Sequence, residues 1–187
     1  MKSRDEIGNL LRSLGLNGIG IEIGVATGKY SKTLLDSTDL KTIYLLDSWK
    51  HYSETEYKDA SNKKQEKQDE FYKMVCGMAK PYGDRAKIIR GDCTVVVNDF
   101  EDEFFDFLYI DANHMYNAIY RDLRQWYPKS KKGGVFSGHD YMNRCNYVGE
   151  CGVKKAVDEF CDEMGVKPKI TGGTRRCPPS WYFIKGE

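Results

Sequence analysis

The sequence predicts an α/β fold in which a mostly parallel sheet is covered by helices on both faces. Short apolar runs alternate along the chain with segments whose apolar residues recur at helical spacing. The apolar runs are continuous rather than alternating with polar residues, as expected for strands that are buried on both faces. The chain has 187 residues, of which 40% are hydrophobic, and this length fits one domain with a sizeable core. We therefore expect a single domain over residues 1–187.

The parallel strands are predicted from five apolar runs, and a carboxylate stands at or near the end of each. The runs are residues 19–24, 41–48, 86–93, 105–112 and 133–140, and the carboxylates are Glu22, Asp47, Asp92, Asp111 and Asp140. One strand that ends in aspartate is explained by capping of the helix that follows, but capping alone does not explain five in succession. Since the carboxyl ends of parallel strands meet at one edge of the sheet, we expect these acids to line one crevice.

Helices are predicted before, between and after these strands from the spacing of their apolar residues. They are predicted over residues 5–15, after Gly28, over 116–127 and over 152–164, with two closing strands within 167–171 and 180–185. The third helix should end near Tyr127, because the residue before a proline avoids helical geometry.

Residues 49–80 interrupt this alternation with a charged stretch and a helix. The apolar stripe of that helix consists of Phe71, Met74, Val75 and Met78. A surface helix with solvated charges explains most of these residues. The alternative is a helical insertion that partly covers the active site. Its position directly after the second strand favours this alternative, because ligands of open α/β sheets bind outside the carboxyl ends of the strands.

The composition excludes several classes of protein. Lys and Arg number 29 against 28 Asp and Glu, and this balance gives no reason to expect binding to nucleic acid or to a membrane surface. The N-terminal stretch does not resemble a signal peptide, and no run approaches the roughly 20 apolar residues of a membrane-spanning helix. The six cysteines have no zinc-site spacing. We expect a cytoplasmic protein with reduced thiols.

The turn after the first strand reads EIGVATGKY, a Glu-x-Gly-x-x-x-Gly pattern formed by Glu22, Gly24 and Gly28. Glycine lets the chain turn tightly and lets a ligand approach the main chain. The pattern is neither the dinucleotide-binding Gly-x-Gly-x-x-Gly nor the Walker motif. Asp47, at the end of the second strand, suits the two hydroxyls of a ribose. Asp92 and the backbone amide beside it could meet an adenine edge.

Several segments together carry a resemblance that covers nearly all of the chain. They are IEIGVATGKYSKTLL, LLDSW, GDC, DFLYIDANHMYNAIYRDLRQWYPKSKKGGVFSGHDY and SWYFIK. They resemble class I S-adenosylmethionine-dependent methyltransferases and, more narrowly, the small O-methyltransferase-like family that includes macrocin O-methyltransferase and is related to cephalosporin hydroxylase. The most specific part is the Asp-x-x-His-x-Tyr to Gly-His-Asp-Tyr series of residues 111–141. The resemblance implies a Rossmann-like, seven-stranded sheet whose last strand is antiparallel.

The resemblance also implies S-adenosylmethionine as the cofactor, bound at the ends of the first four strands. The implied residues are Glu22, Gly24, Ala26, Gly28, Asp47, Ser48, Asp92, Cys93 and Asp111. Gly24 and Gly28 would border the methionine part, and Glu22 would orient their loop. Asp47 would hold the ribose hydroxyls, and Asp92 would lie near adenine.

In several relatives, acids after the fourth and fifth strands bind a divalent cation that holds the acceptor hydroxyl. The matching positions here are Asp111, His139 and Asp140. Magnesium prefers oxygen ligands, whereas imidazole suits ions such as manganese, iron or zinc. Either the metal is therefore not strictly magnesium, or His139 is not a ligand and acts as a second acid–base group. His114 is expected to be the general base beside Asp111, with a pKa suited to neutral pH.

The expected function is O-methylation of a small-molecule, sugar or other glycan hydroxyl, assisted by magnesium or manganese. Two alternatives stay open: a cofactor-binding module without turnover, and a metal-dependent oxidative enzyme. Each site residue also has a purely structural explanation, such as capping by Asp111 or a buried polar pair of His139 and Asp140. A homodimer that buries the N-terminal helix is a further hypothesis.

Overall fold

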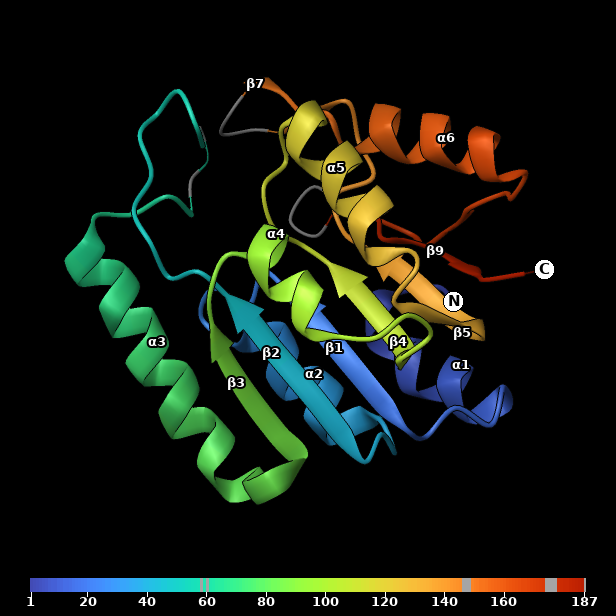
Figure 1. Ribbon diagram of the computed structural model, residues 1–187, viewed down its shortest axis with the longest axis horizontal. Helices are drawn as coiled ribbons and strands as arrows, with labels where there is room; N and C mark the ends of the chain where they lie inside the picture. Colours follow the sequence, from blue (N-terminus) through green and yellow to red (C-terminus); the bar gives the residue numbers. More distant parts are fainter. Residues whose placement is uncertain (58, 60, 146–148, 174–177, 187) are drawn as a thin grey trace.

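The computed structural model describes residues 1–57, 59, 61–145, 149–173 and 178–186. A seven-stranded sheet with the order β3-β2-β1-β4-β5-β9-β8 forms its middle layer (Figure 1). The strands are β1 Ile19–Ile23, β2 Thr42–Asp47, β3 Ala86–Arg90, β4 Phe105–Ile110, β5 Ser130–Gly138, β8 Lys169–Ile170 and β9 Trp181–Ile184. Strands β1 to β5 pair in parallel, and β9 runs antiparallel to both β5 and β8. The predicted fold class, including the antiparallel last strand, is confirmed.

Helices cover both faces of this sheet. They are η1 Arg4–Glu6, α1 Ile7–Ser13, α2 Lys29–Ser37, α3 Gln65–Ala79, η2 Lys80–Arg85, α4 Cys93–Val96, η3 Val97–Asp99, α5 Tyr116–Trp126 and α6 Val153–Met164. One buried apolar cluster joins α1, α2 and α3 to the sheet, and a second joins α4, α5 and α6 to the opposite face. A small hairpin, β6 Arg144–Cys145 and β7 Gly149–Glu150, forms a separate two-stranded sheet. No helix in these described ranges is long and apolar enough to cross a membrane.

The strand register brings the predicted acids to one edge. Ile23 of β1 lies opposite Leu46 of β2 and Ile110 of β4. The ladder continues one residue further, because Gly24 N donates to Leu46 O at 2.9 Å and Asp111 N donates to Ile23 O at 2.8 Å. The arrowheads of β1, β2 and β4 accordingly point toward the same edge in Figure 1. The residues that follow these strands therefore lie side by side.

The structure corrects two details of the predicted elements. The third strand ends at Arg90 rather than at 93, because the Asp92 side chain accepts a hydrogen bond from Thr94 N and caps α4. In α3 the predicted stripe is wrong for Met74, whose side chain is 55% exposed. The other three stripe residues pack against the buried cluster on this face of the sheet: Val75 is buried, and Phe71 and Met78 are partly buried. Val75 and Met78 also lie close to Gly28.

The apolar face of α1 is covered by its own chain. Ile7 and Leu11 are buried in the cluster that contains α2 and the sheet. This packing leaves those two side chains without a role in a dimer contact, and the homodimer stays a hypothesis.

Candidate functional site

A cavity of about 580 Å³ opens at the carboxyl ends of β1, β2, β3 and β4. Of the predicted cofactor residues, all except Gly28 line it: Glu22, Gly24, Ala26, Asp47, Ser48, Asp92, Cys93 and Asp111. Gly28 instead begins α2 in a left-handed conformation, with φ 77°. A cavity of this size at this edge of a parallel sheet is where α/β proteins bind nucleotide-like ligands.

The loop after β1 is built from left-handed residues. Gly24 has φ 92° and Ala26 has φ 48°, a conformation that costs free energy for any residue except glycine. A Cβ atom on Gly24 would lie 2.0 Å from the carbonyl oxygen of Asp111. Glycine is therefore required at position 24 for two separate reasons: its positive φ angle, and the close approach of Asp111, which follows the neighbouring strand β4.

Asp47 ties this loop to the turn after β2. One of its carboxylate oxygens accepts a hydrogen bond from Ala26 N and the other from Trp49 N, each at 2.8 Å. Burial raises the pKa of Asp47, although these amides counteract the shift. Trp49 itself is 0% exposed, and its Nε1 donates to Ala26 O at 2.8 Å. Trp49 thus stabilises the loop through a hydrogen bond from within the core. Tyr52, three residues later, lines the cavity.

Glu22 is a buried carboxyl group beneath the loop. Its side chain is 1% exposed and accepts a hydrogen bond from Ser31 Oγ of α2. Burial raises the pKa of Glu22 to about 8; the Ser31 bond opposes this shift, and the nearby charge of Asp111 adds to it. Near neutral pH the group is therefore mostly protonated, and it links β1 to α2 as a neutral acid.

The far end of the cavity lies near Cys93. Its thiol is 3.8 Å from Asp122 Oδ2, and burial raises the pKa of Cys93 so that it stays a thiol. Burial also raises the pKa of Asp122 to about 6, opposed by the guanidinium of Arg121. Arg121 and Asp122 line the cavity, and sequence reasoning did not single them out. The only signal was the Asp-Leu pair within the series of residues 111–141.

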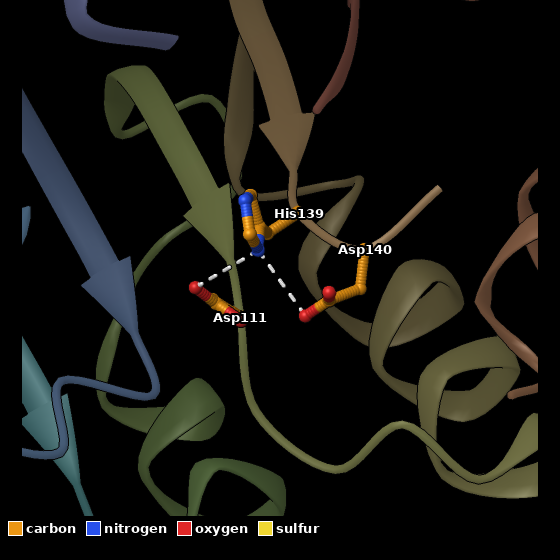
Figure 2. A group of neighbouring side chains, drawn as sticks. All are labelled: Asp111, His139 and Asp140. Carbon is orange, nitrogen blue, oxygen red and sulfur yellow. Dashed lines mark ion pairs between the residues drawn. The ribbon is translucent and has the colours of Figure 1, made fainter. Parts of the chain in front are cut away.

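Two strand ends bring Asp111, His139 and Asp140 together, as Figure 2 shows. His139 Nδ1 lies 3.1 Å from Asp140 Oδ2 and 3.7 Å from Asp111 Oδ2. Asp140 adopts a left-handed conformation with φ 53°, and this backbone turn brings its carboxylate beside His139. Burial alone would raise the pKa of Asp140, but the hydrogen bonds and charges of His114 and His139 hold it well below its usual range.

The donor set of this cluster fits a divalent cation. Its three ligand atoms all lie within 4.8 Å of one another. Ligand atoms that share an ion at about 2.1 Å lie about 3 Å apart in neighbouring octahedral positions, close to the 3.1 Å between His139 and Asp140. One nitrogen and two carboxylates suit manganese, iron or zinc better than magnesium. His139 Nε2 is buried without a hydrogen-bond partner in the described part of the chain.

His114 lies against three carboxylates. Its Nε2 is 3.0 Å from Asp140 Oδ2 and 3.5 Å from Asp111 Oδ1, and its Nδ1 is 2.8 Å from Asp59 Oδ2. Burial by itself lowers the pKa of His114, but the hydrogen bonds to these acids together raise it well above its ordinary value. The expectation of a pKa suited to neutral pH is therefore wrong for this arrangement. This direction favours the protonated imidazole, so His114 would have to give up a proton before it could act as a base.

The loop between β2 and α3 lies over this part of the cavity. Tyr57 Oη donates to Ala112 O and Asn113 Nδ2 donates to Glu56 O, both at 3.2 Å. The loop side chains that line the cavity are Lys50, Tyr52, Glu56, Tyr57, Asp59 and Ser61. From the sequence, Tyr52 could be considered for an acceptor pocket. Glu56, Tyr57 and Asp59 carried no sequence signal, because their contacts join residues about 55 positions apart.

The strand order, the glycine loop after β1 and the acid after β2 define the class I methyltransferase fold. The chain belongs to a family described as a methyltransferase domain, which matches residues 21–141.

Solved structures agree with this assignment at the level of the fold. An O-methyltransferase from Bacillus cereus in complex with S-adenosylhomocysteine is 13% identical, with a TM-score of 0.65 over 97% of this chain and 80% of that one. TomG of Streptomyces achromogenes is an O-methyltransferase involved in tomaymycin synthesis and was solved with S-adenosylmethionine. It is 13% identical, with a TM-score of 0.65 over 97% of this chain and 79% of that one. A curated relative, the uncharacterized protein y4gI of Sinorhizobium fredii, is 29% identical over 72 residues, or 38% of this chain. The match spans only 8% of that relative's length.

Proposed function

We propose that this chain is an S-adenosylmethionine-dependent O-methyltransferase that acts on a small-molecule or sugar hydroxyl with the help of a divalent metal ion. The observation that carries the proposal is one cavity whose wall shares Asp111 with the neighbouring cluster of candidate metal ligands. The glycine loop and Asp47 form one part of its wall, and Asp111 joins that wall to the cluster with His139 and Asp140. Methyl transfer needs such a meeting point between a cofactor and an acceptor oxygen.

The cofactor would lie along the strand ends. The main chain at Gly24 and Ala26 is open to close approach by the methionine part. Asp47 accepts hydrogen bonds from Ala26 N and Trp49 N, and the amides of Val25 and Ser48 also favour its charged form. The ribose hydroxyls would bind the lone pairs that these amides leave open. The adenine would reach Asp92 and the amide of Cys93 at the far end.

In the reaction, the acceptor oxygen attacks the methyl carbon, the carbon–sulfur bond breaks, and its electron pair stays on sulfur. The acceptor hydroxyl must also lose its proton, which His114 on the cavity wall would accept once it has given up a proton of its own. A bound divalent cation would lower the pKa of that hydroxyl and fix its direction, and Asp111, His139 and Asp140 would hold it. His114 bridges Asp111 and Asp140 and thereby holds both carboxylates in place.

Calorimetric titration tests this proposal. We expect micromolar binding of both S-adenosylmethionine and S-adenosylhomocysteine, measured with and without manganese or magnesium. Transfer of a labelled methyl group to members of a hydroxyl panel would then establish turnover. The proposal fails if neither compound binds under any metal condition, and binding without product on every acceptor would favour the binding module.

Replacing Asp140 by asparagine is expected to weaken manganese binding by about 100-fold or more, beyond the loss that follows removal of an outer partner. Asparagine tolerates the positive φ of this position, so the backbone is preserved while the charge is removed. Affinity for S-adenosylhomocysteine should not change, because Asp140 does not line the cavity. Asp36→Asn, at an exposed helix carboxylate that pairs with Lys32, is the control. Equal manganese affinity in both variants would refute the metal site.

One observation favours a second candidate function, a metal-dependent oxidative enzyme. Two imidazoles, those of His114 and His139, lie within 3.1 Å of the same oxygen of Asp140, and mixed histidine and carboxylate sets also bind iron in oxygenases. Oxygen consumption that depends on added ferrous iron would support this candidate, and its absence in the presence of methyl transfer would exclude it.

A further inference from the structure

Arg4, in η1, is a cavity residue that the proposed chemistry does not yet use. Its side chain is 20% exposed and lines the cavity. Nη1 donates to Tyr109 Oη at 3.1 Å and approaches Asp111 Oδ2 at 3.4 Å. The guanidinium lies over the ring of Tyr30, 4.4 Å from its centroid. Residues from η1, α2 and β4 together hold this arginine in position.

The guanidinium has donors to spare. Arginine carries five N–H groups on three nitrogens, and all its hydrogen bonds to described residues leave from Nη1. Its contact with Asp111 is long for a charge-assisted bond, which is typically about 2.7–2.9 Å, and Asp111 is shared with His114 and His139. No Arg4 nitrogen is among the buried unpartnered atoms of the described residues, so the remaining donors are open to the cavity, where a ligand carboxylate could replace water.

Arg4 also stands beside the loop that would carry the methionine part of the cofactor. Its stacking partner Tyr30 lies in the first turn of α2, two residues after Gly28. Tyr30 Oη in turn donates to Arg4 O at 3.1 Å. Arg4 approaches the side chain of Asp111. The main chain of Asp111 packs so closely against Gly24 that a Cβ atom there would clash with it. Arg4 therefore contacts one residue that follows this loop, Tyr30, and one residue that packs against it, Asp111.

The other cations on the cavity wall are less suited to bind an anion there. Lys29 and Lys50 are exposed, so water competes for their charge. Arg121 is already paired with Asp122 through two of its nitrogens, at the far end of the cavity. Among the described lining residues, Arg4 is the cation that combines burial, fixed geometry and free donors.

We propose that Arg4 binds the α-carboxylate of the methionine part of the cofactor. This inference rests on the proposed function, because it assumes that S-adenosylmethionine occupies the cavity. A planar guanidinium can present two parallel donors to a carboxylate, and the Tyr30 ring holds that plane in place. The N-terminal segment thereby becomes part of the cofactor site.

Calorimetry with two ligands tests the assignment. S-adenosylmethionine and its decarboxylated form differ only in the carboxylate. We expect Arg4→Gln to weaken binding of S-adenosylmethionine by about 10- to 100-fold, the range for a hydrogen-bonded charge pair, and to leave binding of the decarboxylated form unchanged or tighter. Arg12→Gln, at an exposed arginine of α1 that pairs with Asp39, should alter neither affinity.

Each outcome decides the question. An equal loss for both ligands would mean that Arg4 only supports the cavity, and no loss for either would mean that it binds no cofactor group; both results overturn the assignment. If Arg4→Gln does not fold, Arg4→Lys replaces it, and we expect an intermediate loss confined to S-adenosylmethionine because the charge remains without the fork. If the unaltered protein binds neither ligand, the proposed function itself fails, a result separate from the other two.

Discussion

Replacing Gly24 by alanine is expected to abolish cofactor binding and to lower the free energy of unfolding by about 3 to 5 kcal/mol. The added Cβ would lie 2.0 Å from Asp111 O and 2.8 Å from Ala112 Cα. Both contacts are with main-chain atoms, and Asp111 N is itself bonded to Ile23 O. The segments that follow β1 and β4 can separate only by breaking this hydrogen bond between them. Gly24 and Asp111 in these segments line the cavity, so its shape would change.

Gly15→Ala is the matched control for this substitution. Gly15 has φ 70°, yet a Cβ atom there would meet nothing within 4 Å. Its replacement should cost only the left-handed strain of about 1 to 2 kcal/mol. Chemical denaturation of both variants and titration with S-adenosylhomocysteine measure the difference. Equal stability of Gly24→Ala and Gly15→Ala would show that the added Cβ at position 24 causes no clash.

Replacing Glu22 by glutamine is expected to remove a loss of stability that begins above about pH 4.5 and is complete above about pH 8. The pKa of Glu22 rises from 4.5 to about 8 in the folded protein, so the folded state binds its proton more tightly than the unfolded state does. Its contribution to stability is therefore fully present below about pH 4.5 and is lost as the pH rises through about 8. The total loss is on the order of 5 kcal/mol.

Glutamine mimics the neutral acid and keeps an acceptor for Ser31 Oγ. The variant should therefore be about as stable as the unaltered protein near pH 5 and clearly more stable near pH 9. Urea denaturation of both proteins across this range measures the difference between them. The raised pKa of His114 also makes stability depend on pH, but it does so equally in both proteins. Its contribution therefore cancels in the difference between their free energies of unfolding. Parallel pH profiles would show that Glu22 ionises normally in the folded chain.

The fold could be predicted because local patterns and the parallel topology agree. Continuous apolar runs with short helices between them have few arrangements that bury every run on both faces. Once the strands are parallel, their carboxyl ends share an edge, and Asp47, Asp92 and Asp111 follow without further information. The structure places these three on one cavity wall.

The protonation of the cluster could not be predicted from the sequence. The spacing of Asp111 and His114 suggested a free histidine near neutral pH, but the loop after β2 adds Asp59 and the turn after β5 adds Asp140. A pKa depends on every charge within a few ångströms. Those distances exist only after segments 26 and 55 positions away from His114 have packed around it.

The amino-acid sequence by itself determined the layers and the edge at which the site lies, because these depend on periodicities of a few residues. The antiparallel last strand was implied by the family resemblance. Only the tertiary structure decided which side chains complete the cavity. Arg4 meets Asp111 across 107 positions, and Asp59 meets His114 across 55. It also buries Trp49 in the core. Such contacts are set by packing between distant segments, and no local pattern encodes them.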